Sequence, residues 1–290
     1  MNMERLYLVA GHLFGVEAPE DILARMKNYE PFRVEAKAGE DSLLLFSLSV
    51  VKDGKGVGYI EELRQDEEGQ EIICGHTGQD DPVFEFRWNG RTAGWLVCSQ
   101  GYGKGTLYLS GYLPKSALDN ALMIQFAMSS ACKDTALFHA AAVSLDGRAY
   151  MFLGKSGTGK STHASLWVRH IGGSELMNDD NPAVRINADG TATVYGTPWS
   201  GKTPCYRNVS CPVGGIVQLS QAPYNKIRRL NGIQAYAALM PSISGKRWDS
   251  GIADGLHRTE NALAGNVPVW HLECLPDEAA ARLCKETIAQ

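Results

Sequence analysis

Residues 150–161 read YMFLGKSGTGKS, an apolar run that passes directly into a glycine-rich segment. From residue 154 onward the segment satisfies the pattern G-x-x-x-x-G-K-[ST] at every fixed position. A helical pattern follows over residues 161–169. The order is therefore strand, loop and helix, which is the context that this motif requires. The stretch predicts a phosphate-binding loop within an α/β fold.

The residue types of this loop suit a nucleotide. Glycines let the chain wrap tightly, so that successive backbone N–H groups point at phosphate oxygens, and the helix that follows adds partial positive charge. Lys160 is expected to neutralise charge on the β- and γ-phosphates, and the Ser161 hydroxyl to be a Mg²⁺ ligand. We therefore expect ATP and Mg²⁺ as cofactors. The residues expected to contact the nucleotide are Gly154, Lys155, Ser156, Gly157, Thr158, Gly159, Lys160, Ser161 and Thr162.

A pair of carboxylates, Asp179 and Asp180, follows an expected short strand over residues 175–177. If the chain folds back to the loop, one carboxylate can hold Mg²⁺ and the other can accept a proton from an attacking hydroxyl. Adjacent strand residues point to opposite sides, so only one of them is expected to face the γ-phosphate. The alternative is an exposed acidic turn.

A second loop, residues 196–202 (GTPWSGK), has the composition of a binding segment. Lys202 could make a further phosphate contact, and Trp199 could stack on a base or cover the site. The alternative is a tight turn between strands with Trp199 buried beneath it.

The rest of the chain indicates two domains. Its 290 residues, 44% hydrophobic and 21% charged, suffice for one large domain or two modest ones. Short alternating runs and turn dipeptides such as Asn89-Gly90 make residues 1–115 β-rich. We expect an α/β (α+β) fold in which residues 116–290 form a mixed sheet carrying the loop. The β-rich N-terminal domain is then the expected site of acceptor recognition.

Net charge, apolar segments and cysteine spacing indicate which partners and which compartment to expect. A net charge of −4 does not favour nucleic-acid binding, and the apolar stretch 121–131 is too short to span a bilayer. No secretory signal is evident at the N-terminus. The seven cysteines form no C-x-x-C pair, which indicates free thiols in a reducing compartment. We expect a cytoplasmic protein that binds neither nucleic acid nor membranes; homo-oligomerisation stays open.

Residues 138–186 (FHAAAVSLDGRAYMFLGKSGTGKSTHASLW…LMNDDNPAVRI) resemble the catalytic domain of HPr kinase/phosphorylase. That family belongs with the phosphoenolpyruvate carboxykinases in a P-loop class of its own. Its pattern has a strand that starts at a histidine, a turn with glycine, the loop G-x-S-G-x-G-K-S, and an Asp-Asp pair after the first helix. His139, Gly147, the loop and the acid pair stand here in the same order.

The resemblance implies a role for each matching residue. Lys160 would bind phosphate, Ser161 would bind Mg²⁺, and Asp180 would be the proton acceptor. From its position after the loop we also expect Asp180 to be a Mg²⁺ ligand. His139 would lie near the phosphates; its alternative role is a hydrogen-bonded histidine at a strand start. Thr162 departs from the family, which usually carries glutamate there, and the downstream Glu-x-Arg-Gly signature is absent.

The chain is thus similar to a divergent member of this family. We expect an ATP- and Mg²⁺-dependent kinase that moves the γ-phosphoryl group to a hydroxyl of a protein, a peptide or a small molecule. One alternative is carboxykinase- or phosphorylase-type chemistry on the same scaffold. Another is a non-catalytic sensor of ATP.

Overall fold

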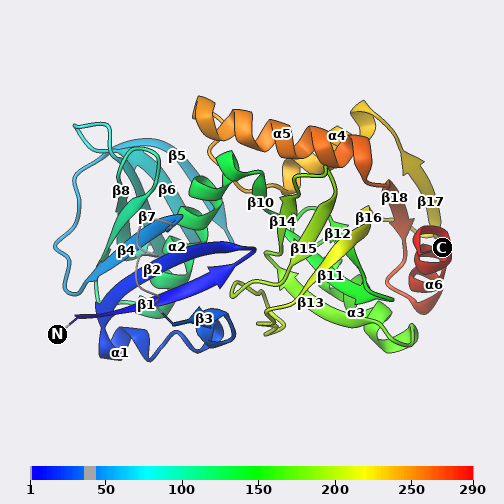
Figure 1. Cartoon of the computed structure of the whole chain (residues 1–290), viewed down its shortest axis with the longest axis horizontal. Helices are drawn as coiled ribbons and strands as arrows, with labels where there is room; N and C mark the ends of the chain where they lie inside the picture. Colours follow the sequence, from blue (N-terminus) through cyan, green and yellow to red (C-terminus); the bar gives the residue numbers. More distant parts are fainter. Residues whose placement is uncertain (1, 36–43, 290) are drawn as a thin grey trace. The chain divides into compact units, whose positions relative to one another are not determined.

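The computed structural model describes residues 2–35 and 44–289, and it divides into two compact units, Met1–Ser130 and Ala131–Gln290. A large mixed sheet forms the centre of each unit (Figure 1). The mixed α/β class expected from the sequence is therefore confirmed, with sheet as the predominant structure.

The first unit consists mainly of strands. Its elements are β1 (Asn2–Val9), β2 (His12–Pro19), α1 (Glu20–Leu23), η1 (Lys27–Phe32), β3 (Arg33–Val34), β4 (Phe46–Val51), β5 (Ile60–Glu67), β6 (Gln70–His76), β7 (Pro82–Trp88), β8 (Arg91–Cys98), β9 (Lys104–Leu109) and α2 (Pro114–Ser130). The sheet order is β3-β1-β2-β4-β9-β8-β7-β6-β5. Helix α2 packs on β4, β8 and β9, so it belongs to this unit although it begins near the expected boundary at residue 115.

Local turn chemistry explains the β7–β8 hairpin. Asn89 and Gly90 both have positive φ angles, 49° and 73°, and Trp88 pairs directly with Arg91 across the turn. Such two-residue turns match the right-handed twist of the strands that they connect. The hairpin predicted from the dipeptide is confirmed.

The second unit carries the glycine-rich loop. Its elements are η3 (Ala131–Lys133), β10 (Thr135–Leu137), β11 (Ala140–Leu145), β12 (Arg148–Leu153), α3 (Lys160–His170), β13 (Glu175–Asp180), β14 (Ala183–Ile186), β15 (Ala192–Tyr195), β16 (Ser210–Gln221), β17 (Lys226–Leu230), α4 (Ile233–Leu239), η4 (Met240–Ser242), α5 (Ser250–Asn266), β18 (Val269–Cys274) and α6 (Glu278–Ile288). The sheet order is β10-β14-β15-β16-β12-β11-β13, and β18 also pairs with β16 and β17.

Strand direction brings several carboxyl ends to one edge of this sheet. Strand β12 runs parallel to β16, and β16 runs parallel to β18. Strand β11 is antiparallel to both of its neighbours, β12 and β13, so these two run in the same direction. The carboxyl ends of β12, β13, β16 and β18 therefore meet at the edge where the glycine-rich loop begins.

The core of this unit accounts for the apolar run that precedes the loop. Strand β12 is buried from Ala149 to Leu153 because it is central and both faces are covered. On one face, Trp167 of α3 lies with its ring 5.3 Å from the ring of Tyr150 and 5.4 Å from that of Phe152. Cys284 of α6 belongs to the same cluster. Truncating a buried tryptophan to alanine costs roughly 3–5 kcal/mol, so this cluster anchors α3 firmly on the sheet.

Candidate phosphate-binding site

The loop between β12 and α3 spans residues 154–159 and turns at glycines. Gly157 and Gly159 have φ angles of +76° and +108°, which residues with a Cβ rarely adopt. A Cβ at either position would meet no atom within 4 Å, so the constraint is the backbone conformation and not a lack of space. The chain thus uses glycine here to form a curved loop whose backbone stays open to a ligand.

Lys160 is the first residue of α3 and is buried. Its Nζ donates to the carbonyl oxygens of Gly154 at 3.0 Å and Lys155 at 3.3 Å. The ammonium is therefore held against the start of the loop. Because α3 begins at this residue, the partial positive charge of the helix N-terminus adds to that of the ammonium.

Sheet register brings the acid pair near the loop. Ala140 of β11 pairs with Leu153 on one side and with Asp180 on the other. Two strand spacings separate the backbones of Leu153 and Asp180, a distance of about 10 Å. Strand β13 continues through both acids, so the alternative of an exposed acidic turn does not hold.

The two carboxylates face different surroundings. Asp179 is only 2% exposed; its Oδ2 accepts from the backbone N–H of Thr203 at 3.2 Å, and its Oδ1 has no hydrogen-bond partner among the described residues. Asp180 is half-buried, and its Oδ2 accepts from Nδ2 of Asn181 at 2.7 Å. Its Oδ1 lies 3.2 Å from Nδ1 of His139. Asp180 is therefore the acid that a substrate can reach.

The GTPWSGK segment lies along the end of β13. Asn178 donates through Nδ2 to the carbonyl oxygens of Thr197 and Trp199, and Gly201 N–H donates to the carbonyl of Asp179 at 2.7 Å. A Cβ at Gly201 would lie 2.8 Å from that same carbonyl oxygen, so glycine permits the close approach. The structure thereby brings the segment beside the acid pair.

One expectation for this segment needs correction. Trp199 is 4% exposed, so its ring is not available to stack on a base. The hydrogen bonds from Asn178 draw the turn against β13, and this arrangement matches the alternative in which Trp199 lies beneath the turn. Lys202, in the same segment, is exposed and stays accessible to an anion.

The oxygen donors near the loop suit a hard cation. The described residues contain no cluster of three or more His, Cys, Asp or Glu side chains that could enclose a metal. Mg²⁺ in phosphate sites is usually held by one or two protein oxygens together with phosphate and water, so it needs no such cluster. The Ser161 hydroxyl and the Asp180 carboxylate are donors of this kind, and they fit Mg²⁺ better than a softer metal.

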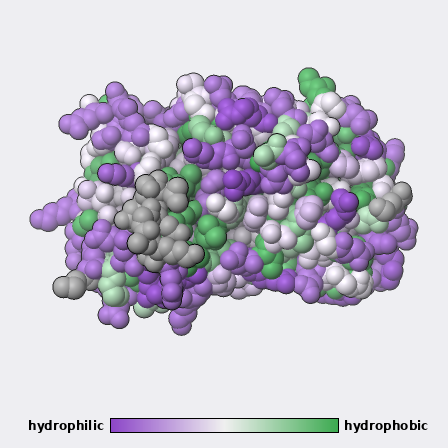
Figure 2. Space-filling model, in the orientation of Figure 1, coloured by the Kyte–Doolittle hydropathy of each residue, from purple (hydrophilic) through white to green (hydrophobic). Residues whose placement is uncertain are grey.

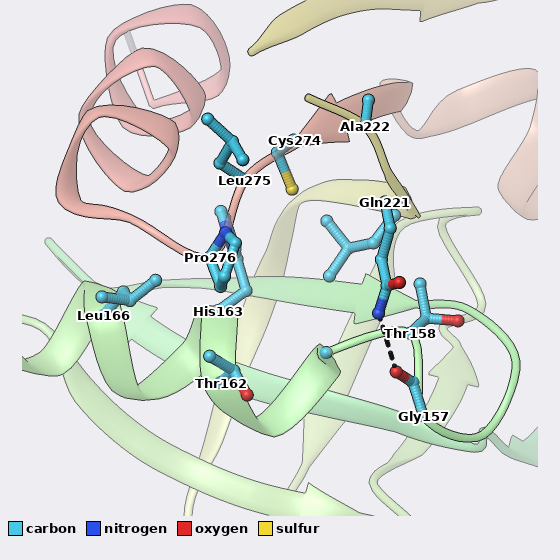
Figure 3. Close-up of a pocket in the computed structure, with 12 residues that line it drawn as sticks. Gly157, Thr158, Thr162, His163, Leu166, Gln221, Ala222, Cys274, Leu275 and Pro276 are labelled. Carbon is cyan, nitrogen blue, oxygen red and sulfur yellow. Dashed lines mark hydrogen bonds between the residues drawn. The ribbon is translucent and has the colours of Figure 1, made fainter. Parts of the chain in front are cut away.

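A cavity of about 600 Å³ lies beside the loop (Figure 3). It is bounded by the loop, by the first turns of α3, and by the ends of β16 and β18. Gln221, at the end of β16, donates through Nε2 to the carbonyl oxygen of Gly157 at 3.1 Å (Figure 3). A cavity of this size is typical of small-molecule sites.

Sequence reasoning named the cavity residues that belong to the predicted phosphate-binding segment, but it missed the rest of the lining. His163 directly follows the recognised loop, but a histidine on a helix carries no signal of its own. Gln221 and Cys274 are separated from the loop by long stretches of chain. They reach it only because β12, β16 and β18 are parallel neighbours, which no local pattern reveals.

No family model matches the chain, and no curated protein matches it. Across the described residues, every helix is too short or too polar to cross a membrane.

Proposed function

We propose that this protein is an ATP- and Mg²⁺-dependent phosphotransferase of the HPr kinase/phosphoenolpyruvate carboxykinase type. The observation that carries the proposal is the common sheet edge of the glycine-rich loop and Asp180, with only β11 between their strands. At this edge the Lys160 ammonium and the loop N–H groups can bind phosphates. The accessible Asp180 carboxylate can accept the proton of a hydroxyl group.

The local fold order supports the assignment to this class. An antiparallel hairpin, β11–β12, precedes the loop, and helix α3 leads to a strand that ends in the acid pair. The HPr kinase/phosphorylase family, which the chain resembles, has the corresponding residues in the same order. The segment of residues 196–202 replaces the signature that the family carries downstream, so the acceptor is expected to differ from that of the sugar-regulatory enzyme.

The chemistry follows from these positions. The oxygen of an acceptor hydroxyl attacks the γ-phosphorus and forms a new P–O bond, while the bond from the γ-phosphorus to the β–γ bridging oxygen breaks. ADP leaves with that electron pair, and the hydroxyl proton passes to Asp180. Lys160 and the loop N–H groups neutralise charge on the phosphates. Bound Mg²⁺, held by Ser161 and Asp180, would supply further charge neutralisation.

ATP turnover by the purified chain with Mg²⁺, with and without a panel of hydroxyl acceptors, tests the proposal. Asp180→Asn should retain ATP binding and lose at least about 100-fold in kcat, because general-base catalysis contributes that much or more. Lys160→Ala should weaken ATP binding itself. Asp254→Asn, the same chemical change at an exposed position of α5, is the matched control and should behave like the unmodified protein.

Two results would contradict the proposal. Tight ATP binding without turnover for any acceptor, unaffected by Asp180→Asn, would favour a sensor of ATP. An absence of nucleotide binding would overturn the site as a whole.

A further inference from the structure

His163 presents a fixed hydrogen-bond donor to the cavity beside the loop. The side chain lines that cavity and is 3% exposed. Trp167 Nε1 donates to His163 Nε2 at 3.2 Å. An indole N–H can only donate, so Nε2 must be the unprotonated nitrogen and the proton of the neutral ring is on Nδ1. Burial lowers the pKa of this histidine to about 4, which keeps the ring neutral.

The donor on Nδ1 has no acceptor within residues 2–35 and 44–289. The ring is held in place by Trp167 and by an edge contact with Phe152, whose ring centroid is 4.7 Å away. Nδ1 is not one of the fully buried unpaired atoms of the described residues, so it is accessible in the cavity that His163 lines, where a ligand acceptor can reach it.

Gln221 supplies a complementary acceptor. Its Nε2 donates to the carbonyl oxygen of Gly157, which can only accept, so the orientation of the carboxamide is determined. The remaining oxygen, Oε1, has no donor in the part of the chain that the structure describes. Gln221 is exposed, so Oε1 is accessible to a ligand, and the lining of the cavity thus carries one donor on α3 and one acceptor at the end of β16.

The rest of the cavity is neutral. No charged side chain belongs to its described lining, and Leu166, Leu219 and Pro276 contribute apolar surface. Burial raises the pKa of the Cys274 thiol to about 11, so it stays protonated and uncharged. A flat, neutral heteroaromatic group fits such walls better than a sugar or a charged group does. Since the cavity borders the loop at Gly157 and Thr158, its occupant can be joined to phosphates bound there.

We propose that this cavity is an adenine site. Nδ1–H of His163 donates to a ring nitrogen of the base, and Oε1 of Gln221 accepts from the 6-amino group. Guanine carries a carbonyl oxygen where adenine carries that amino group, so an acceptor would meet Oε1 and the pairing would fail. His163 and Gln221 thereby select adenine nucleotides. The inference rests on the proposed function only in requiring a nucleotide whose phosphates occupy the loop.

Calorimetric binding of ATP, GTP and inorganic tripolyphosphate to the full chain tests the adenine site. The unmodified protein should bind ATP at least tenfold more tightly than GTP. His163→Gln keeps an acceptor for Trp167 but provides no donor at the Nδ1 position, and Gln221→Leu removes the acceptor. Both should reduce the preference for ATP to near unity and leave tripolyphosphate binding unchanged. Ser220→Ala is the matched control, because that hydroxyl bonds to His271 and does not line the cavity.

A second measurement needs no variant and stands even if a substitution disturbs folding. Purine riboside triphosphate lacks the 6-amino group, and the 1-, 3- and 7-deaza analogues of ATP each lack one ring nitrogen. The unmodified protein should lose at least tenfold in affinity for the first and for at least one of the others. Equal affinity for ATP, GTP and all analogues would overturn the adenine site.

The outcomes separate this inference from the proposed function. Selective adenine binding without turnover would overturn the phosphotransferase and support the adenine site. A protein that binds neither tripolyphosphate nor ATP would overturn both.

Discussion

At the residue scale, the contact between His139 and Asp180 assigns His139 a positioning role. The two side chains approach to 3.2 Å at the edge of the sheet, and both are half-buried. The backbone N–H of His139 also donates to the carbonyl of Ser242 at 2.6 Å, which fixes the residue at the start of β11. The sequence left open whether this histidine lies near the phosphates or only forms a hydrogen bond. Its neighbour in the structure is the proposed base.

Replacement of His139 should therefore change catalysis more than binding. We expect His139→Ala to lower kcat about tenfold, the order found when a residue that orients a reactive group is removed. KM for ATP should stay unchanged. Because asparagine can still hydrogen-bond to Asp180, His139→Asn should retain more activity than the alanine variant. An unchanged kcat in His139→Ala, or equal kcat values in the alanine and asparagine variants, would leave this histidine with a structural role alone.

His163 should make stability depend on pH. Its pKa falls from 6.5 to about 4 on folding, so the unfolded chain binds more protons between these values. The stabilising contribution is complete above pH 6.5 and is lost as the pH falls towards 4. Between pH 7 and pH 5 the loss amounts to about 2 kcal/mol. Urea unfolding at both pH values measures it, and His163→Gln should show a correspondingly smaller decrease. An equal decrease in the variant would contradict the assignment.

At the element scale, the glycine-rich loop and α3 act as one unit. The loop needs positive φ angles at Gly157 and Gly159, and α3 needs Trp167 in the core to hold its N-terminus at the loop. Trp167 also sets the tautomer of His163. The packing of α3 therefore determines where its N-terminus points at the phosphate-binding loop. It also determines which nitrogen of His163 is the hydrogen-bond donor in the cavity.

Substitution of a loop glycine should show the cost of its backbone conformation. Gly157→Ala should destabilise the protein by about 1–2 kcal/mol, because an L-residue is strained at positive φ. It should also weaken ATP binding, since relaxation of the strain moves the loop N–H groups. Gly172→Ala is the control: that glycine also has open space around a Cβ, but not a positive φ. Chemical denaturation and calorimetry on both variants give the comparison, and equal effects would contradict the reasoning.

At the scale of the whole molecule, each of the two units has its own sheet and its own buried residues. Figure 2 shows a visible surface that is largely hydrophilic, with apolar residues in small groups. The larger exposed apolar side chains include Ile60 in the first unit and Ile233 and Trp248 in the second. Such single positions are ordinary for a protein surface and indicate no docking site by themselves.

Nucleotide binding should raise the free energy of unfolding of the second unit. ATP with Mg²⁺ at 100 times its Kd should stabilise the nucleotide-binding unit by about 2.7 kcal/mol, because the ligand binds the folded form only. Hydrogen exchange followed by mass spectrometry should show slower exchange in peptides covering residues 154–162, and also in the β12 and α3 core. Lys160→Ala should abolish the effect at the same ATP concentration. Unchanged exchange in the unmodified protein would argue against a nucleotide in the loop.

What the sequence determined by itself is local. An apolar run, a glycine-rich segment and a helical pattern lie within some twenty consecutive residues, so short-range rules suffice to predict a strand, a phosphate loop and a helix. The Asn89-Gly90 turn could be predicted for the same reason, since the positive φ angles favour those residue types. Alternation along a strand also predicted that Asp179 and Asp180 would differ in their surroundings.

Only the tertiary structure decided which distant residues meet the loop. Parallel pairing of β12 with β16 and of β16 with β18 brings Gln221 and Cys274 to the cavity, and pairing of β11 with both β12 and β13 sets the distance to Asp180. Trp199 is likewise buried in a segment whose backbone accepts a hydrogen bond from Asn178, a residue of the distant strand β13. Strand order and register arise from the packing of the whole sheet. The periodicity of side chains along a strand predicts which of its faces is buried, but not which strand pairs with it.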